Sequence, residues 1–246
     1  MPMSSSGSGR PPAEAAPGWR HILDAGLAVF IKEVRSEVRT RYALNAVLLF
    51  AVCTIVAVSL GLGPIAPRRN PDLPLIQAAL LWMAVLFAAF TGLARTFIQE
   101  EDARTAAALR LAAPALAVFL GKAWFNTLLL GLLTSLSAAL FLVLLRVGVA
   151  DLAQFCLVLA LGSAGLVAAT TLIAAIIARA SARGALFAVL SFPLLTPLLV
   201  VAIRATALAI EGVTWAVIGP PLQILAAYAI ALFTASLLLF DVVWEA

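Results

Sequence analysis

The sequence is short of charge and of the side chains that hold metals. Asp, Glu, Lys and Arg make up only 11% of the 246 residues, and there is a single histidine. Soluble domains typically carry about 25% charged residues, so this chain could not cover its surface with polar groups in water. With 64% hydrophobic residues and a mean hydropathy of +1.10, it is predicted to be an all-α integral membrane protein in a lipid bilayer. Its net charge of +4 does not imply nucleic-acid binding.

Residues for chemistry within the membrane are also scarce. Cys53 and Cys156 lie in apolar runs, where we expect small buried side chains and no disulfide or zinc site. His21 precedes these runs, and no glycine-rich phosphate loop of the ATPase type occurs. The sequence therefore predicts no catalytic residue, no metal site and no cofactor on this chain. A membrane enzyme is the weakest functional alternative.

The N-terminal part divides into two segments. Residues 1–18 are rich in Ser, Gly, Pro and Ala and predict a disordered cytoplasmic tail. Residues 19–42 have apolar positions at helical spacing and basic residues on the other faces, which predicts an amphipathic helix. We interpret it as lying in the headgroup layer of a negatively charged leaflet. A solvated helix that packs on a partner is the alternative.

Residues 43–246 contain six apolar stretches, each near the roughly 20 residues needed to cross a bilayer. The predicted spans are Ala43–Leu62, Leu75–Ala94, Trp124–Leu145, Leu152–Ala178, Ala185–Leu208 and Leu222–Val243. We expect no ionisable side chain well inside any of them. This absence argues against an ion-coupled carrier.

The basic residues predict the orientation, because cytoplasmic loops accumulate Lys and Arg. With the N-terminus inside, twelve basic residues are cytoplasmic: Arg10, Arg20, Lys32, Arg35, Arg39, Arg41, Arg95, Arg104, Arg110, Lys122, Arg179 and Arg183. Four lie outside: Arg68, Arg69, Arg146 and Arg204. Both termini are therefore predicted to be cytoplasmic in a multi-pass protein.

Residues 95–122, between the second and third predicted spans, concentrate charge. The acidic run Glu100, Glu101 and Asp102 precedes alanines and a leucine, an order that favours a helix with acid at its N-terminal end. Pro114 then predicts a break. We expect a short surface helix that either docks a soluble partner or simply connects two spans.

The fifth predicted span holds two prolines, Pro193 and Pro197, four residues apart. Each removes a backbone hydrogen bond, so a kinked or two-piece helix is expected, with Ser191 or Thr196 available to satisfy the freed carbonyl groups. The break is either a hinge in a transport pathway or a packing kink.

Two segments of the chain resemble the CcmB family, the heme exporter protein B permeases of cytochrome c maturation. The first carries Phe97, Glu100, the acidic run, Leu109, Leu111, Pro114, Gly121, Lys122 and Asn126. The second carries Arg183, Gly184, Leu186, Pro193, Leu194, Pro197, Leu198, Leu199, Ala205 and Thr206. The resemblance extends from Leu27 to Val243. Where the family has Gly and Glu near the start of the cytoplasmic helix, this chain has Arg104 and Ala107.

The resemblance implies the transmembrane permease of an ATP-binding cassette (ABC) complex in the bacterial inner membrane, with a fold similar to ABC-2 type exporters. It implies a CcmA-like ATPase subunit that binds ATP and Mg, CcmC-like and CcmD-like membrane partners, and two permease copies. Heme would be the cargo or be bound by a partner, and release of a heme-loaded chaperone is an alternative role. The ATPase-coupling residues implied are Phe97, Glu100, Glu101, Asp102, Arg104, Arg110 and Lys122; the hinge or pathway residues are Arg183, Gly184, Pro193 and Pro197.

Two further functions remain open from the residues alone. An ABC-2 permease for a lipid, polysaccharide or drug would have the same span pattern and cytoplasmic helix. A membrane scaffold without a transport cycle would have no ATPase partner.

Overall fold

The computed structural model describes residues 19–40, 42–62, 71–92, 112–177 and 183–245. Regular structure in these ranges is entirely α-helical, as predicted. The helices are α1 (Trp19–Thr40), α2 (Tyr42–Leu62), α3 (Leu73–Gly92), α6 (Ala115–Leu144), α7 (Leu152–Ile177), α8 (Arg183–Glu211) and α9 (Trp215–Glu245). The predicted tail, residues 1–18, lies outside the described residues.

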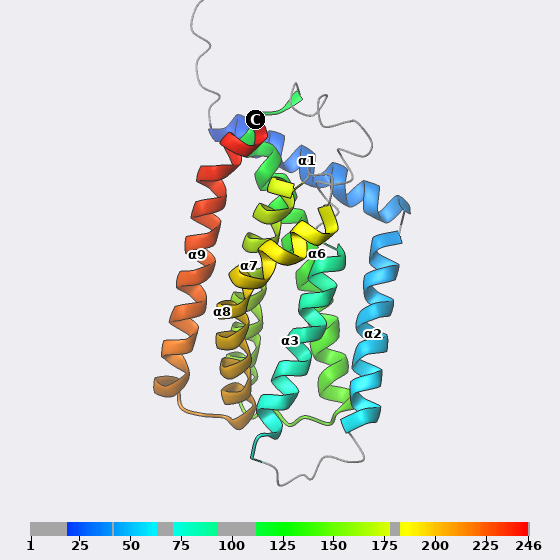
Figure 1. The fold of residues 1–246 in the computed structure, drawn as a ribbon, viewed down its shortest axis with the longest axis vertical. Helices are drawn as coiled ribbons and strands as arrows, with labels where there is room; N and C mark the ends of the chain where they lie inside the picture. The colour runs from blue at the N-terminus through cyan, green and yellow to red at the C-terminus, as the bar shows by residue number, and fades with distance from the viewer. Residues whose placement is uncertain (1–18, 41, 63–70, 93–111, 178–182, 246) are drawn as a thin grey trace, which may run out of the picture.

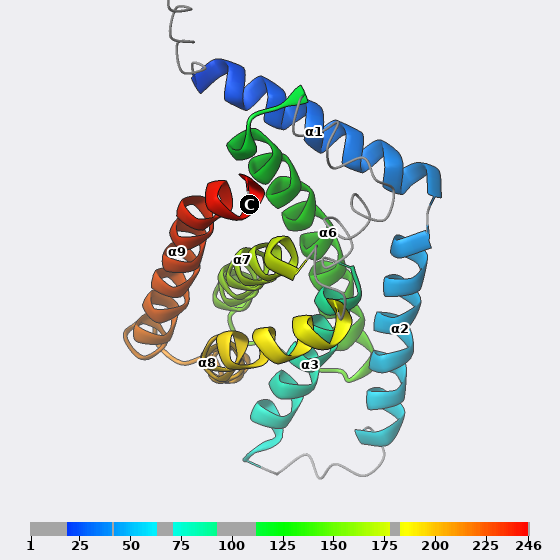
Figure 2. The same cartoon turned by 45° about the horizontal axis from the view of Figure 1, so that its top comes forward.

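The helices from α2 to α9 run between the two ends of a bundle, and α1 lies across one end (Figure 1). Chain direction alternates from α2 to α9, so α9 ends on the side where α1 lies. Figure 2 shows α7 enclosed by its neighbours, and α7 packs on α6, α8 and α9. The helix α7 is therefore the centre of the bundle.

Within the described residues, five helices are long and apolar enough to cross a membrane: α3, α6, α7, α8 and α9. The first predicted span, Ala43–Leu62, coincides with α2, whose described residues provide a shorter apolar stretch, Val52–Gly61. A multi-pass membrane protein follows from these helices. Lipid tails are as apolar as the helix surfaces, so close packing and buried polar contacts hold such a bundle together.

The third span begins earlier than the sequence predicts, at Ala115 rather than Trp124. Pro114 occupies the position before the first helical residue in an extended conformation, with φ −62° and ψ 148°. A proline there costs no helical hydrogen bond, because the first N–H groups of a helix have no intrahelical partner. The end of the predicted cytoplasmic connection, with Lys122, is therefore part of α6.

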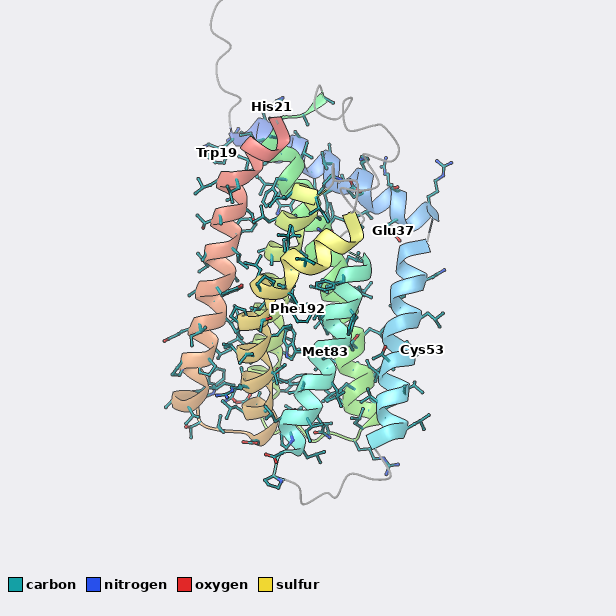
Figure 3. All side chains as sticks on the ribbon, viewed as in Figure 1. Trp19, His21, Glu37, Cys53, Met83 and Phe192 are labelled. Atoms are coloured by element: carbon teal, nitrogen blue, oxygen red, sulfur yellow. The ribbon has the colours of Figure 1, made fainter. Side chains whose placement is uncertain are left out.

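The last span also begins earlier, at Trp215 rather than Leu222, because Pro220 and Pro221 are accommodated inside α9. The two cysteines correct another expectation. Cys53 of α2, labelled in Figure 3, and Cys156 of α7 are exposed rather than buried. Both belong to apolar helices, and Cys156 lines a groove between α6 and α7.

A buried tryptophan of α3 contacts two other helices, α7 and α8, in the core. Trp82 of α3 is fully buried, and its indole N–H donates to the Thr206 hydroxyl oxygen of α8 at 2.8 Å. Its ring packs against Gly162 of α7, where even one methyl group would collide with the ring. This contact ties α8, beyond its two prolines, to α3 and α7.

Candidate functional site

The α1–α6 junction is built on backbone contact. A Cβ atom placed on Gly121 of α6 would lie 2.6 Å from the carbonyl oxygen of Gly26 and 2.7 Å from Cβ of Val29, both in α1. Real Cβ atoms do not approach backbone this closely, so a glycine is required at position 121 for α1 to rest on α6. We call Gly26, Val29, Glu33, Gly121 and Lys122 the α1–α6 junction.

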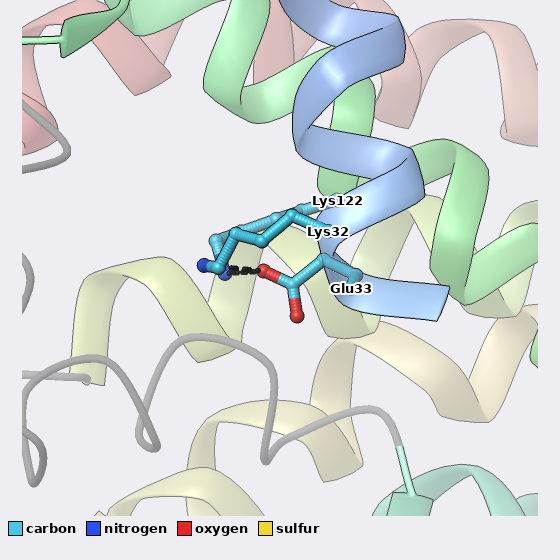
Figure 4. A network of polar contacts seen from close by, with 3 residues as sticks. All are labelled: Lys32, Glu33 and Lys122. Carbon is cyan, nitrogen blue, oxygen red and sulfur yellow. Dashed lines mark hydrogen bonds and ion pairs between the residues drawn. The ribbon is translucent and has the colours of Figure 1, made fainter. Parts of the chain in front are cut away.

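A buried ion pair lies next to this glycine contact. The Lys122 ammonium donates to Glu33 Oε1 at 2.7 Å, and the side chains are 0% and 9% exposed (Figure 4). The ammonium group of Lys32 lies 3.3 Å from the same carboxylate oxygen, and 48% of the Lys32 side chain is exposed at the surface. One carboxylate of α1 thus faces one buried and one surface lysine.

The burial of this pair decides its energetic weight. A surface ion pair typically contributes about 0–1 kcal/mol, whereas removing one partner of a buried pair costs about 3–5 kcal/mol because a charge stays behind in low dielectric. Lys122 belongs to the second class. The position of α1 on α6 is therefore fixed by both shape and charge.

One turn further along α6, a second buried contact leads into the bundle centre. The Asn126 amide donates to the Thr171 hydroxyl oxygen of α7 at 2.8 Å, and both side chains are fully buried. The Asn126 side-chain oxygen has no hydrogen-bond partner among the described residues. Lys122 and Asn126, four residues apart on one face of α6, thus connect this helix to α1 and to the central helix α7.

The second feature is a bend in α8. Pro193 and Pro197 lie inside this single helix, and its direction changes near Phe192 (Figures 1 and 3). The expected kink is thus present, and its cause is the loss of two backbone N–H donors together with the bulk of the proline rings.

Hydroxyl groups support the bent segment from within and from α9. Thr196 donates to the Phe192 carbonyl oxygen at 2.6 Å, and the hydroxyl of Tyr228 in α9 donates to the Leu194 carbonyl oxygen. Ser191 was the other residue expected to serve this purpose, but its buried hydroxyl has no partner among the described residues. The bend is therefore held by α9 as well as by its own sequence.

Two apolar grooves lie on the face formed by α6, α7 and α9. One, of about 510 Å³, runs between α6 and α7, and the other, of about 470 Å³, also reaches α9. Both include Thr127, Ala164 and Val167, so they are continuous. Within the described residues, no three His, Cys, Asp or Glu side chains come together near these grooves or elsewhere.

The structure describes only part of the predicted site. Phe97, Glu100, Glu101, Asp102, Arg104 and Arg110 lie outside the described residues. Arg183 and Gly184 begin α8, where the backbone alone is described. Of the predicted coupling residues, Lys122 is therefore the one whose surroundings are known. It lies inside the bundle rather than in a cytoplasmic connection.

Lys122 is the eighth residue of α6, and Arg204 lies seven residues before the end of α8. Both charged side chains therefore belong to helices long enough to cross a membrane, and Lys122 does so because its span begins earlier than predicted. Sequence reasoning missed the partner Glu33, although a signal was present. Glu33 is an acid in the row formed by Gly26, Val29 and Phe30, the positions that face the bundle.

Comparison with known families gives a match over most of the chain. The family described as CcmB protein matches residues 24–242. This range includes the α1–α6 junction and the α8 bend. A search of the curated proteins finds no match.

Proposed function

The chain belongs to the CcmB family, and from this membership we propose that it is the permease subunit of an ABC complex in cytochrome c maturation. The family implies a membrane permease of heme export that is not itself catalytic. Beyond this, we propose that the chain converts ATP hydrolysis on a CcmA-like partner into movement of its own helices. ATP and Mg would then be held by the partner. Heme would be cargo or be bound elsewhere, and the alternative output is release of a heme-loaded chaperone.

The observation that carries this proposal is the α1–α6 junction. Residues 95–122 are proposed to contact the ATPase through Phe97, Glu100, Glu101, Asp102, Arg104 and Arg110, and this segment continues directly into α6 at Ala115. The beginning of α6 is the part that Gly121 and Lys122 fix to α1. A push on the connection would therefore move α1 and α6 together, as a change between two populated arrangements.

We propose that the α8 bend is where this movement is absorbed. On the N-terminal side of the bend, Arg183 and Gly184 begin the helix, and on its C-terminal side Thr206 is fixed to Trp82. Pro193 and Pro197 lie between a fixed part and a part that can tilt. A bend supported by one hydroxyl from α9 requires little energy to change.

In the membrane, α2 is proposed to be a sixth span in an arrangement similar to ABC-2 exporters. Its 21 residues correspond to about 31 Å of helix, close to the roughly 30 Å of hydrocarbon. The helix α1 is proposed to lie in the headgroup layer. Leu23, Leu27 and Ile31 form an exposed apolar row on it, and the exposed Arg35 and Arg39 continue this row at the same spacing.

The proposed orientation places α1 and both termini on the cytoplasmic side of the bacterial inner membrane, as the twelve basic residues predict. The proposed complex contains two copies of this chain, two ATPase subunits, and CcmC-like and CcmD-like membrane proteins. An ABC-2 permease for another cargo and a scaffold are the functions that the following experiment distinguishes from this one.

The test is isolation of the chain from native membranes in mild detergent, identification of copurifying proteins by mass spectrometry, and ATPase assay of the complex. We expect an ATPase with heme-handling membrane proteins. Replacing Glu100, Glu101 and Asp102 together by Ala should reduce ATPase stimulation and leave membrane insertion intact. Unchanged stimulation would exclude the acidic run as the contact. An ATPase without heme-handling partners would favour another cargo, and no ATPase would favour the scaffold.

A further inference from the structure

Arg204 is an exposed cation inside a membrane span. The five candidate spans contain three charged residues by sequence: Lys122, Arg204 and Glu211. Lys122 is buried and paired, and Glu211 ends its helix. Arg204 is exposed and makes no hydrogen bond or ion pair with any described residue. It is thus the one charge that faces the surroundings of the bundle from within these spans.

An unpaired guanidinium in hydrocarbon is unfavourable, so its charge must be compensated from outside the chain. Arg204 lies seven residues before Glu211, which is about 10 Å along the helix from the C-terminal end of α8. A long arginine side chain can extend over such a distance toward the headgroup layer while its methylene groups stay among apolar atoms. The compensating group is therefore an anion at the depth of the headgroups.

The surface of α8 on the N-terminal side of Arg204 is apolar. Phe192, Val200 and Arg204 are exposed at multiples of four residues along one face of α8, with 67% and 49% exposed fractions for the first two. Thr196 belongs to the same row, but its hydroxyl is bonded to the Phe192 carbonyl oxygen of its own helix. We call Phe192, Thr196, Val200 and Arg204 the α8 face. It presents apolar atoms along the span and a single positive charge near one end.

We propose that the α8 face binds a phospholipid of the leaflet at the end opposite α1, with its phosphate on Arg204 and an acyl chain along Val200 and Phe192. The charge complementarity and the depth of the guanidinium carry this assignment, since Arg recognises phosphate through paired N–H donors. The same lipid holds the part of α8 beyond the prolines, which the Trp82–Thr206 contact already fixes from inside. The assignment rests on α8 being a span and is independent of any ATPase partner.

A second copy of this chain is the other occupant that such a face could meet. Copies related by a two-fold axis along the membrane normal bring identical residues together at equal depth. Two Arg204 side chains would then approach each other, and like charges repel at low dielectric. The charge on this face therefore favours a lipid phosphate over a second α8 face.

The experiment is lipid titration of the full chain in detergent, followed by native mass spectrometry. Phosphatidylglycerol is the probe, and diacylglycerol with the same acyl chains is the phosphate-free control. We expect the wild-type chain to bind the phospholipid in preference to diacylglycerol. Arg204→Gln should weaken phosphatidylglycerol binding about tenfold, as expected for loss of a charge-assisted hydrogen bond. Arg146→Gln removes a charge outside the spans and should leave binding unchanged.

Three results would overturn the assignment. Equal binding of phosphatidylglycerol and diacylglycerol by the wild-type chain would exclude phosphate recognition, and this comparison needs no variant to fold. Equal loss in Arg204→Gln and Arg146→Gln would show a general charge effect. A change in dimer content in Arg204→Gln with unchanged lipid binding would show that the α8 face meets a second copy.

Discussion

Replacing Glu33 or Lys122, the buried ion pair of the α1–α6 junction, should destabilise the contact of α1 with α6. Replacing the surface residue Lys32 should have a much smaller effect. Lys122 is fully buried and Glu33 nearly so, so each single replacement should lower the free energy of unfolding by about 3–5 kcal/mol. In Lys122→Met, Glu33 still has Lys32 at 3.3 Å. The loss in free energy of unfolding for this variant should therefore lie at the lower end of the range. Glu33→Gln removes the carboxylate that Lys32 and Lys122 share, and its loss should fall within the same range.

The double variant Glu33→Gln with Lys122→Met carries neither charge. Because it leaves no uncompensated ion, its loss should be smaller than the sum of the single losses by about 2–3 kcal/mol. Lys32→Met is the matched control, since its half-exposed ion pair should contribute about 0–1 kcal/mol.

The assay is unfolding of the detergent-solubilised chain by sodium dodecyl sulfate, followed by tryptophan fluorescence. The signal is the sum over five tryptophans, among them Trp19 at the beginning of α1 and the buried Trp82. Additive losses in the double variant would refute the reasoning. So would a Lys32→Met variant as unstable as Lys122→Met, because the pair would then behave as a surface contact.

Three further predictions concern packing and hydrogen bonds, all measured by the same unfolding assay. Gly121→Ala should lower the free energy of unfolding by about 1–3 kcal/mol, since its Cβ meets the backbone of α1. The control Gly131→Ala places its Cβ in open space and should be neutral or stabilising. An equal effect of both would contradict the close contact. Thr206→Val leaves the buried indole N–H of Trp82 without its acceptor and should cost about 1–3 kcal/mol; a neutral result would show another acceptor. Tyr228→Phe should cost about 1 kcal/mol and speed hydrogen exchange at the α8 bend, and unchanged exchange would show that this hydroxyl does not support the bend.

Helix content could be predicted from the sequence because apolar length is a strong signal. The predicted span Leu152–Ala178 differs from α7 by one residue at its end, and Ala43–Leu62 differs from α2 by one at its start. The errors fall at the starts of two spans. Pro114 is non-helical, in agreement with the predicted break, but α6 begins directly after it, and α9 begins before Pro220. Whether a proline interrupts a helix depends on its distance from the helix start, which composition does not reveal.

The site was predictable only where its residues act locally. The kink in α8 follows from Pro193 and Pro197 themselves. The pairing of Glu33 with Lys122 joins positions 89 residues apart and depends on how α1 crosses the bundle. The charged Lys122 looked like a loop residue because its partner was not visible in the sequence. The coupling roles of Phe97, the acidic run, Arg104 and Arg110 stay predictions.

The position of α1 has a mechanical consequence. Only residue 41 lies between the end of α1 at Thr40 and the beginning of α2 at Tyr42, while Gly121 and Lys122 attach the middle of α1 to α6. With so short a link, α1 cannot turn without carrying the start of α2 with it. We expect that a tilt of α1 about its contact with α6 would displace the beginning of α2.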